Sequence, residues 1–246
     1  MRIARDLAAA FQFFTRLPIP GHHFSGDSVA QSARFFPLVG LVVGLGASAL
    51  HRVLTGNIGS GPLAALILTY LVLVTGGFHE DGLADAADGF GGGWTRERIL
   101  EIMRDSRIGS FGALALFLSL LLRYSLLSSL STRNFSAYVI AAHVLCRWTT
   151  LPLSFFLKPA RRDGQGVNVA QRISAVSCVI GTVLTLTICF FLLRRAFWTP
   201  LAATAGVTLL TALYYRGQIG GVTGDCFGAT NQAAEIAVYF CGVLAS

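Results

Sequence analysis

Seven apolar segments of the chain each approach the length that a helix needs to cross a lipid bilayer. A hydrocarbon core about 30 Å thick requires about 20 mostly apolar residues, at a helical rise of about 1.5 Å per residue. The last segment is the least apolar, because it begins with the polar stretch ATNQAAE. The segments that we predict to be transmembrane helices are 35–55, 62–79, 110–130, 135–157, 173–193, 196–215 and 229–245.

The composition favours a membrane protein over an ordinary soluble domain. Of the 246 residues, 54% are hydrophobic and only 13% are charged, whereas charged residues usually make up about a quarter of a soluble chain. The N-terminal stretch MRIARDLAAAFQFFTRLPIP contains Arg5 and Asp6 and lacks a clean cleavage site, so we interpret it as a retained surface helix. We expect an all-α, polytopic integral membrane bundle of about seven transmembrane helices, with residues 1–246 forming one domain.

The basic residues predict which side of the membrane each loop occupies. With the N-terminus in the cytoplasm, thirteen arginine and lysine residues lie in inside segments and four lie outside. Because cytoplasmic loops are enriched in basic residues, this favours a cytoplasmic N-terminus and explains the positive net charge without a nucleic-acid partner. The pair Arg194 and Arg195 fits less well, and leaves open a re-entrant hairpin of the fifth and sixth segments. The segments predicted to share the cytoplasmic side are 76–93, 94–109, 158–172 and 216–228.

The stretch GGFHEDGLADAADGFGGG places four of the chain's twelve acidic residues directly after an apolar segment. If the helix continues into this stretch, Asp81, Asp85 and Asp88 share one face at positions i, i+4 and i+7. Carboxylates stacked in this way repel one another unless a cation neutralises them, and oxygen-only ligands suit Mg²⁺. We therefore predict a Mg²⁺ site, and expect Glu80, about 100° from Asp81 around the helix, to tolerate glutamine. The alternative to a metal site is that these acidic residues form a solvated helix end just beyond the membrane.

The stretch MRDSRIGSFG, residues 103–112, is expected to bind phosphate. Arg104, Ser106 and Arg107 precede the start of a predicted helix, and such donors near a helix N-terminus bind phosphate oxygens well. Arginines in a cytoplasmic loop also serve as topology signals, which is the alternative for Arg104 and Arg107 if they are considered alone. Because these arginines are expected to face a cluster of carboxylates and a metal ion, a site for a diphosphate is favoured.

The stretch GGVTGDCFGATNQ, residues 220–232, forms a third polar region, with Thr223, Asp225 and Asn231 among four glycines. Asp225 is the only acidic residue between Asp163 and Glu235. We expect it to act either as a fourth metal ligand or as the base that receives a hydroxyl proton. From the residues alone, the chain is a metal-dependent membrane enzyme of phosphate chemistry whose site opens to the cytoplasm.

Charged residues within the predicted spans are expected to face the interior of the bundle, because an ion is costly in lipid. These are Arg123, His143 and Arg147. His143 and Arg147 share one helical face, and either close the site or stabilise the packing.

Four stretches together resemble the bacterial cobalamin synthase family, whose members are also called adenosylcobinamide-GDP ribazoletransferases. The resemblance covers nearly the full chain in the expected order. It implies a multi-pass enzyme of the bacterial inner membrane that requires Mg²⁺. It also implies the transfer of adenosylcobinamide phosphate from adenosylcobinamide-GDP to α-ribazole or α-ribazole 5′-phosphate, with release of GMP. The stretches are FFTRLPIP at 13–20, GGFHEDGLADAADGF at 76–90, EIMRDSRIGSFG at 101–112 and GGVTGDCFGATNQAAE at 220–235.

Residue pattern and resemblance together give a set of candidate site residues. Gln232 departs from the family pattern, in which glutamate is expected. The lipid bilayer is an implied partner, and a homo-oligomer or a complex with other cobalamin-assembly enzymes stays open. The predicted catalytic residues are Asp81, Asp85 and Asp225; the metal ligands Asp81, Asp85 and Asp88; and the substrate-binding residues His79, Arg104, Ser106, Arg107, Thr223 and Asn231.

Other classes of protein share parts of this pattern. Membrane prenyltransferases and CDP-alcohol phosphotransferases also bind a metal diphosphate with aspartate-rich helices, although prenyltransferases usually have two such clusters. Ion or proton transporters carry acids and glycine-broken helices within the membrane. A transporter is expected to show an internal repeat and acids in mid-span, and this sequence shows neither.

Overall fold

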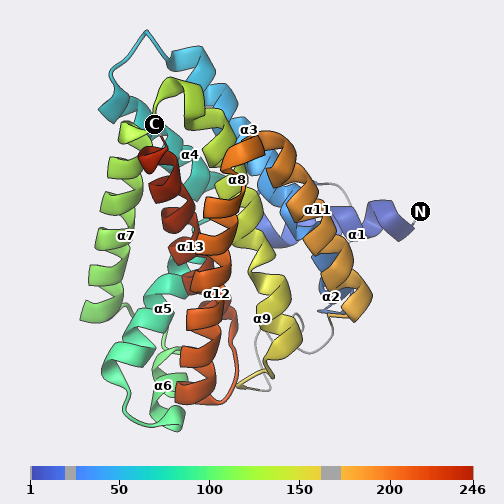
Figure 1. Cartoon of the computed structure of the whole chain (residues 1–246). Coiled ribbons are helices and arrows are strands. Elements are labelled where there is room, and N and C mark those ends of the chain that lie inside the picture. The colour runs from blue at the N-terminus through green and yellow to red at the C-terminus, as the bar shows by residue number, and fades with distance from the viewer. Residues whose placement is uncertain (1, 20–25, 162–172, 246) are drawn as a thin grey trace.

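The chain forms a bundle of helices, as predicted, and the computed structural model describes residues 2–19, 26–161 and 173–245 (Figure 1). These residues contain no β-strand, and two isolated backbone bridges join Thr55 to Ile58 and Pro159 to Val222. The helices are α1 (Arg2–Phe14), α2 (Gly26–Ser32), η1 (Ala33–Phe35), α3 (Phe36–Leu54), α4 (Ser60–Thr75), α5 (Phe78–Gly92), α6 (Arg96–Ile102), α7 (Ser110–Ser129), α8 (Thr132–Trp148), α9 (Thr150–Phe156), α11 (Ala175–Leu193), η2 (Arg194–Ala196), α12 (Trp198–Ile219) and α13 (Gly224–Leu244).

The predicted count of seven transmembrane helices is only partly reproduced. Among the described residues, four helical stretches are long and apolar enough to cross a membrane, and a fifth if a bent pair of helices counts as one span. α12 and α13 are long helices where spans were predicted, but polar side chains lower their hydropathy. The four stretches are Val29–Leu54, Ser110–Ser129, Thr132–Phe156 and Ala175–Ala196.

The second apolar helix does not continue into the acidic stretch, and this corrects the prediction of a continuous span over 62–79. It ends at Thr75, and α5 begins at Phe78 with its axis turned by 87°. Gly76 and Gly77 both adopt left-handed backbone angles, with φ of +67° and +69°. A side chain is disfavoured in that region, so two consecutive glycines permit the sharp break. The acidic residues therefore lie on a separate helix.

The N-terminal helix α1 lies across the direction of α3 and α11 (Figure 1). Asp6, which is 1% exposed, accepts a hydrogen bond of 2.7 Å from Arg34 just before α3. Ala10 and Phe14 are also buried, whereas Ile3 is exposed. The helix is thus amphipathic, with its inner face fixed on the bundle.

Close helix crossings build the centre of the bundle. At Gly40 and Gly44 of α3, a Cβ atom would collide with the backbone of α8 at His143 and Ile140. Gly82 of α5 and Gly228 of α13 form a second close crossing, where a Cβ atom would lie 3.2 Å and 3.0 Å from the facing backbone. The outer helices α7, α11 and α12 instead carry exposed apolar side chains, as lipid contact requires.

The loops predicted to share one side of the membrane meet at one end of the bundle. Arg96 donates to the carbonyl oxygens of Ile219, at 2.9 Å, and Ala160, at 2.6 Å. The Pro159–Val222 bridge joins the same two loops directly. The acidic helix α5 runs towards this end (Figure 1). Residues 162–172, which belong to the predicted cytoplasmic loop 158–172, lie outside the described residues.

Candidate active site

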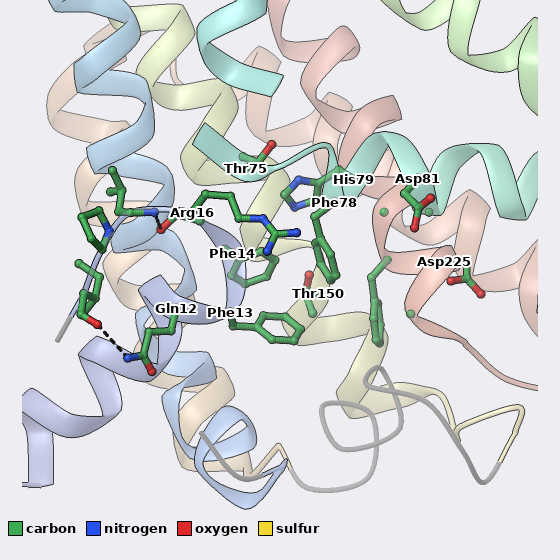
Figure 2. A pocket seen from close by; sticks show the side chains of 18 of the residues that line it. Gln12, Phe13, Phe14, Arg16, Thr75, Phe78, His79, Asp81, Thr150 and Asp225 are labelled. Carbon is green, nitrogen blue, oxygen red and sulfur yellow. Dashed lines mark hydrogen bonds between the residues drawn. The ribbon is translucent and has the colours of Figure 1, made fainter. Parts of the chain in front are cut away.

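A cavity of about 700 Å³ opens between the N-terminal segment and two helix starts (Figure 2). One wall is formed by residues 12–19, at and after the end of α1. The start of α5 and the start of α13 form the opposite wall, and Thr150 of α9 and Arg161 complete the lining. A volume in the range of about 300–1,000 Å³ is typical of small-molecule sites.

Carboxylates from two helices meet beside this cavity. Asp81 of α5 and Asp225 of α13 both line it. The charges of Asp225, Asp81 and Asp88 all act on Asp85, which lies one turn beyond Asp81. The approach is set by Gly82, where a Cβ atom would lie 3.2 Å from the Cα atom of Asp225. The structure thus places Asp225 beside the acidic helix, on the side expected from the topology, while its role as metal ligand or base stays a prediction.

The third predicted metal ligand, Asp88, contacts a different part of the chain. Its carboxylate accepts hydrogen bonds from the backbone amides of Gly109, at 2.7 Å, and Gly112, at 2.8 Å. These amides belong to the start of α7, where unpaired N–H groups favour a negative charge. Asp88 thus shares the helical face of Asp81 and Asp85, but its carboxylate fixes α7 to α5.

Asp81, Asp85 and Asp225 fit Mg²⁺ by the type of their donors. They supply only oxygen, from two facing helices, and repel one another without a cation. Their oxygens are not gathered into a tight group in the described residues. The group whose ligand atoms do lie within 4.8 Å of one another is His143, Cys146 and Glu235.

Two arginines for which the sequence predicts no role in the site, Arg16 and Arg161, lie at the cavity. Arg161 donates to Oδ2 of Asp225 at 3.2 Å, and its Nη1 atom is buried without a hydrogen-bond partner among the described residues. Arg16 lies over Gly76, where a Cβ atom would collide with it, and its guanidinium points towards His79 (Figure 2). The sequence signal for Arg16 was its place in the stretch FFTRLPIP, while Arg161 had no signal beyond its charge.

The predicted arginines of the 103–112 stretch lie elsewhere. Arg107 lines a second hollow of about 530 Å³, which also contacts Asp88 and does not include Asp81 or Asp225. Arg107 pairs with Asp105 and holds the pKa of that carboxyl down to about 2. Arg104 and Ser106 are exposed in the same loop. The structure therefore separates this loop from the main cavity, with Asp88 between them.

The remaining predicted substrate-binding residues have structural partners or are buried. Thr223 caps α13, because its hydroxyl accepts from the amide of Cys226 at 3.3 Å, and it donates to Asp225 at 3.2 Å. Asn231 is buried, and its Nδ2 atom has no hydrogen-bond partner in the described part of the chain. His79 lines the cavity and stacks on Phe14 with ring centroids 5.5 Å apart, and no described residue pairs with its Nε2 atom.

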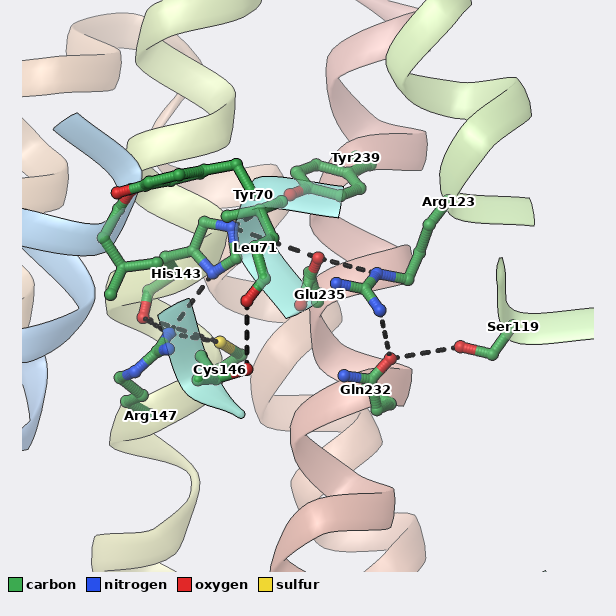
Figure 3. A network of polar contacts seen from close by, with 12 residues as sticks. Tyr70, Leu71, Ser119, Arg123, His143, Cys146, Arg147, Gln232, Glu235 and Tyr239 are labelled. Atoms are coloured by element: carbon green, nitrogen blue, oxygen red, sulfur yellow. Dashed lines mark hydrogen bonds and ion pairs between the residues drawn. The ribbon is translucent and has the colours of Figure 1, made fainter. Parts of the chain in front are cut away.

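A buried ionic network lies deeper in the bundle (Figure 3). Arg123 of α7 bonds Glu80 of α5 at 2.7 Å and Glu235 of α13 at 2.9 Å. It also donates to Oε1 of Gln232, which accepts a second bond from Ser119. Glu80 points away from the aspartates, as predicted. We also expected Glu80→Gln to be tolerated, and the ion pair with Arg123 argues against this, because glutamine would remove a charge from it. The partner of Glu80 is the buried guanidinium of Arg123, 43 residues further along the chain on α7.

The predicted inward orientation of Arg123, His143 and Arg147 is confirmed, since all three are at most 2% exposed. His143 bonds Tyr239 at 3.1 Å and lies 3.2 Å from Nη1 of Arg147. A cation held by His143, Cys146 and Glu235 would lie between two guanidiniums, those of Arg123 and Arg147. The two guanidiniums would repel that cation, so we interpret the cluster as a packing network and not as a metal site.

Comparison with known proteins identifies a close match over almost the whole chain. The family model described as cobalamin-5-phosphate synthase matches residues 6–243. A protein of Mesorhizobium japonicum named adenosylcobinamide-GDP ribazoletransferase is 42% identical over 242 residues, covering 96% of this chain and 92% of that protein. Proteins with the same name from Shewanella baltica (42% identical, 94% and 90% covered) and Ralstonia nicotianae (38% identical, 95% and 93% covered) are also similar. No solved structure matches this chain.

Proposed function

Because this chain belongs to the cobalamin-5-phosphate synthase family, we propose that it is a transferase of the final assembly of cobalamin. It joins adenosylcobinamide-GDP to α-ribazole or α-ribazole 5′-phosphate and releases GMP. The enzyme is a multi-pass membrane protein, and we assign it to the bacterial inner membrane with its site on the cytoplasmic side. Relatives at about 40% identity that carry the ribazoletransferase name support this reaction.

The observation that supports this function most directly is the mixture of charges at the main cavity. Asp81 and Asp225 line it together with the guanidiniums of Arg16 and Arg161. Carboxylates suit a divalent cation, and guanidiniums suit the oxygens of a phosphate. A diphosphate that carries its metal ion needs both kinds of group within one site.

The reaction requires alignment and charge neutralisation more than covalent participation of the protein. An oxygen of the acceptor's ribose forms a bond to the phosphorus that bears the aminopropanol arm of the corrinoid. The bond from that phosphorus to the bridging oxygen breaks, and GMP leaves with the electron pair. The hydroxyl proton passes to a carboxylate, for which Asp225 lies at the cavity wall beside Arg161.

We assign the metal to Asp81, Asp85 and Asp225. When bound there, Mg²⁺ supplies positive charge to the diphosphate oxygens and relieves the repulsion among the three carboxylates. Asp88 holds the start of α7 against α5, so the loop of Arg104, Ser106 and Arg107 keeps its place beside the acidic helix. We assign this loop to the GMP part of the donor, because its hollow lies on the other side of Asp88.

The function is tested with the full-length protein in liposomes. We expect GMP release that requires adenosylcobinamide-GDP, α-ribazole and Mg²⁺ together, and that is lost in Asp85→Asn. Prenyl diphosphates and CDP-alcohols, tested in parallel, address the competing transferases and should give no product. If the complete mixture released no GMP and one of those other donors were turned over, the proposed reaction would be wrong and the reaction of that donor would take its place.

A further inference from the structure

The end of the main cavity away from Asp81 and Asp225 is lined with aromatic rings (Figure 2). Phe13 and Phe78 are half-buried and meet edge to face, with ring centroids 5.3 Å apart. Behind them, Phe14 is buried and stacks on His79. The cavity therefore has a charged end, with Asp81 and Asp225, and an aromatic end, beside which the guanidinium of Arg16 also lies.

The aromatic end is held rigidly by the backbone around it. The amide of Arg16 donates to the carbonyl oxygen of Val74 at 2.8 Å, which joins the segment after α1 to the end of α4. Gln12 donates to the carbonyl oxygen of Ile19 at 3.1 Å and closes the segment on itself. The left-handed break that follows Thr75 then directs Phe78 towards Phe13. The rings are therefore positioned before any ligand arrives, which limits the ordering cost of binding.

Two polar groups in the lining of the cavity, His79 beside the rings and Arg161 beside Asp225, each have a nitrogen without a partner among the described residues. Nε2 of His79 and Nη1 of Arg161 are buried and make no hydrogen bond. Buried polar groups are usually paired, because an unpaired one carries a desolvation cost. A ligand with an apolar planar part and a hydroxylated part would cover the rings and pair these groups.

We propose that the aromatic end binds the planar base of the acceptor nucleoside and directs its ribose towards Asp225. This inference rests on the proposed function, in which the acceptor is α-ribazole, a riboside of a dimethylated benzimidazole. That base is apolar and flat, as packing against the accessible faces of Phe13 and Phe78 requires. The macrocycle of the corrinoid is several times larger than a nucleoside, so it stays outside while its phosphate arm reaches the charged end.

The guanosine of the donor matches the aromatic end less well. Guanine carries several donors and acceptors on its edges, which need partners when buried. The cavity is also lined by Leu17, Pro18 and Ile19, and the amide nitrogen of Gln12 already bonds the Ile19 carbonyl. The rings and this apolar rim together favour a base with methyl groups.

The experiment replaces the rings while keeping apolar bulk, with Phe13→Leu and Phe78→Leu in the full-length protein. The control is Phe117→Leu, on the exposed face of α7. Steady-state KM is measured for donor and acceptor separately in liposomes, and α-ribazole binding without magnesium is measured by equilibrium dialysis. We expect the KM and Kd of α-ribazole to rise on the order of ten- to a hundred-fold, the range found for loss of a stacking ring. The donor KM and the Phe117→Leu control should not change.

The conservative variant Phe13→Tyr keeps the ring and should keep the affinity for α-ribazole, which separates stacking from a general packing defect. An unchanged α-ribazole Kd in both leucine variants would overturn the proposal. So would a rise limited to the donor KM, which would assign the aromatic end to guanosine. Failure of the proposed function is a separate result, because wild-type protein would then release no GMP whatever it binds in dialysis.

Discussion

Replacing Arg123 with leucine is expected to destabilise the protein more than any other single loss of a charge in the described residues. Arg123 is 1% exposed and pairs with both Glu80, whose side chain is 12% exposed, and Glu235, at 2%. Without the guanidinium, two buried carboxylates lose their counter-charge and the amide of Gln232 loses a donor. Breaking a buried pair in this way costs about 3–5 kcal/mol.

The magnitude can be measured as a shift of the thermal unfolding midpoint. For a chain of this size each kcal/mol corresponds to roughly 2–4 °C, so Arg123→Leu should lower Tm by about 6–20 °C. The assay is unfolding of detergent-solubilised protein, with Arg133→Leu as the control, since Arg133 is exposed at the start of α8.

A second variant separates charge from packing. Arg123→Leu combined with Glu80→Gln and Glu235→Gln removes all three charges, and should recover at least half of the lost Tm. Replacing an entire buried ionic group by neutral side chains is often tolerated, whereas removing one partner is not. A Tm of Arg123→Leu within about 2 °C of wild type would refute the reasoning, because the smallest expected shift is about 6 °C. A triple variant as unstable as the single one would refute it too.

Four further predictions concern the site and the topology. Asp85→Asn should reduce Mg²⁺-dependent turnover by orders of magnitude at equal expression, because it removes one charge from the carboxylate group; wild-type turnover would exclude Asp85 as a ligand. Gly76→Ala should lower the free energy of unfolding by at least about 1–2 kcal/mol, because φ is positive and the new methyl group meets the Arg16 side chain. The control Gly206→Ala, in open space on α12, should leave Tm unchanged or raised, and a comparison of unfolding midpoints tests both. Arg107→Lys should raise the KM of adenosylcobinamide-GDP more than the retained charge suggests, because lysine lacks the planar two-pronged contact; an unchanged KM would leave Arg107 as a topology signal. Reporter fusions should read periplasmic after Arg133 and cytoplasmic at the N-terminus, and identical readings would contradict the assigned topology.

The fold could be predicted from the sequence where hydrophobic length alone decides the outcome. The helices α3, α7 and α11 begin and end within two residues of the predicted bounds. The break at Gly76 and Gly77 could not be predicted in the same way. Glycines in an apolar helix serve both for close packing and for left-handed turns, and the sequence pattern is the same in the two cases.

The candidate site could be predicted where residues share one helix, or where whole loops share one side of the membrane, as those of Asp81 and Asp225 do. It was missed where a single side chain contacts another helix. The shared face of Asp81 and Asp85 follows from helical spacing. The partner of Asp88 lies 21 and 24 residues further along the chain, at amides that carry no side-chain signal. Arg16 and Arg161 were missed because the positive-inside rule explains any cytoplasmic arginine equally well.

The buried network of Arg123 also bears on how the chain enters the membrane during synthesis. An arginine at the centre of an inserting helix costs about 2.5–3.5 kcal/mol. Glu80 precedes Arg123 by 43 residues, so this counter-charge has already been synthesised when α7 inserts. Glu235 follows 112 residues later, on the last helix. The final helix therefore brings its carboxylate into a bundle in which the matching guanidinium is already in place, and its docking completes the pairing that began with α5.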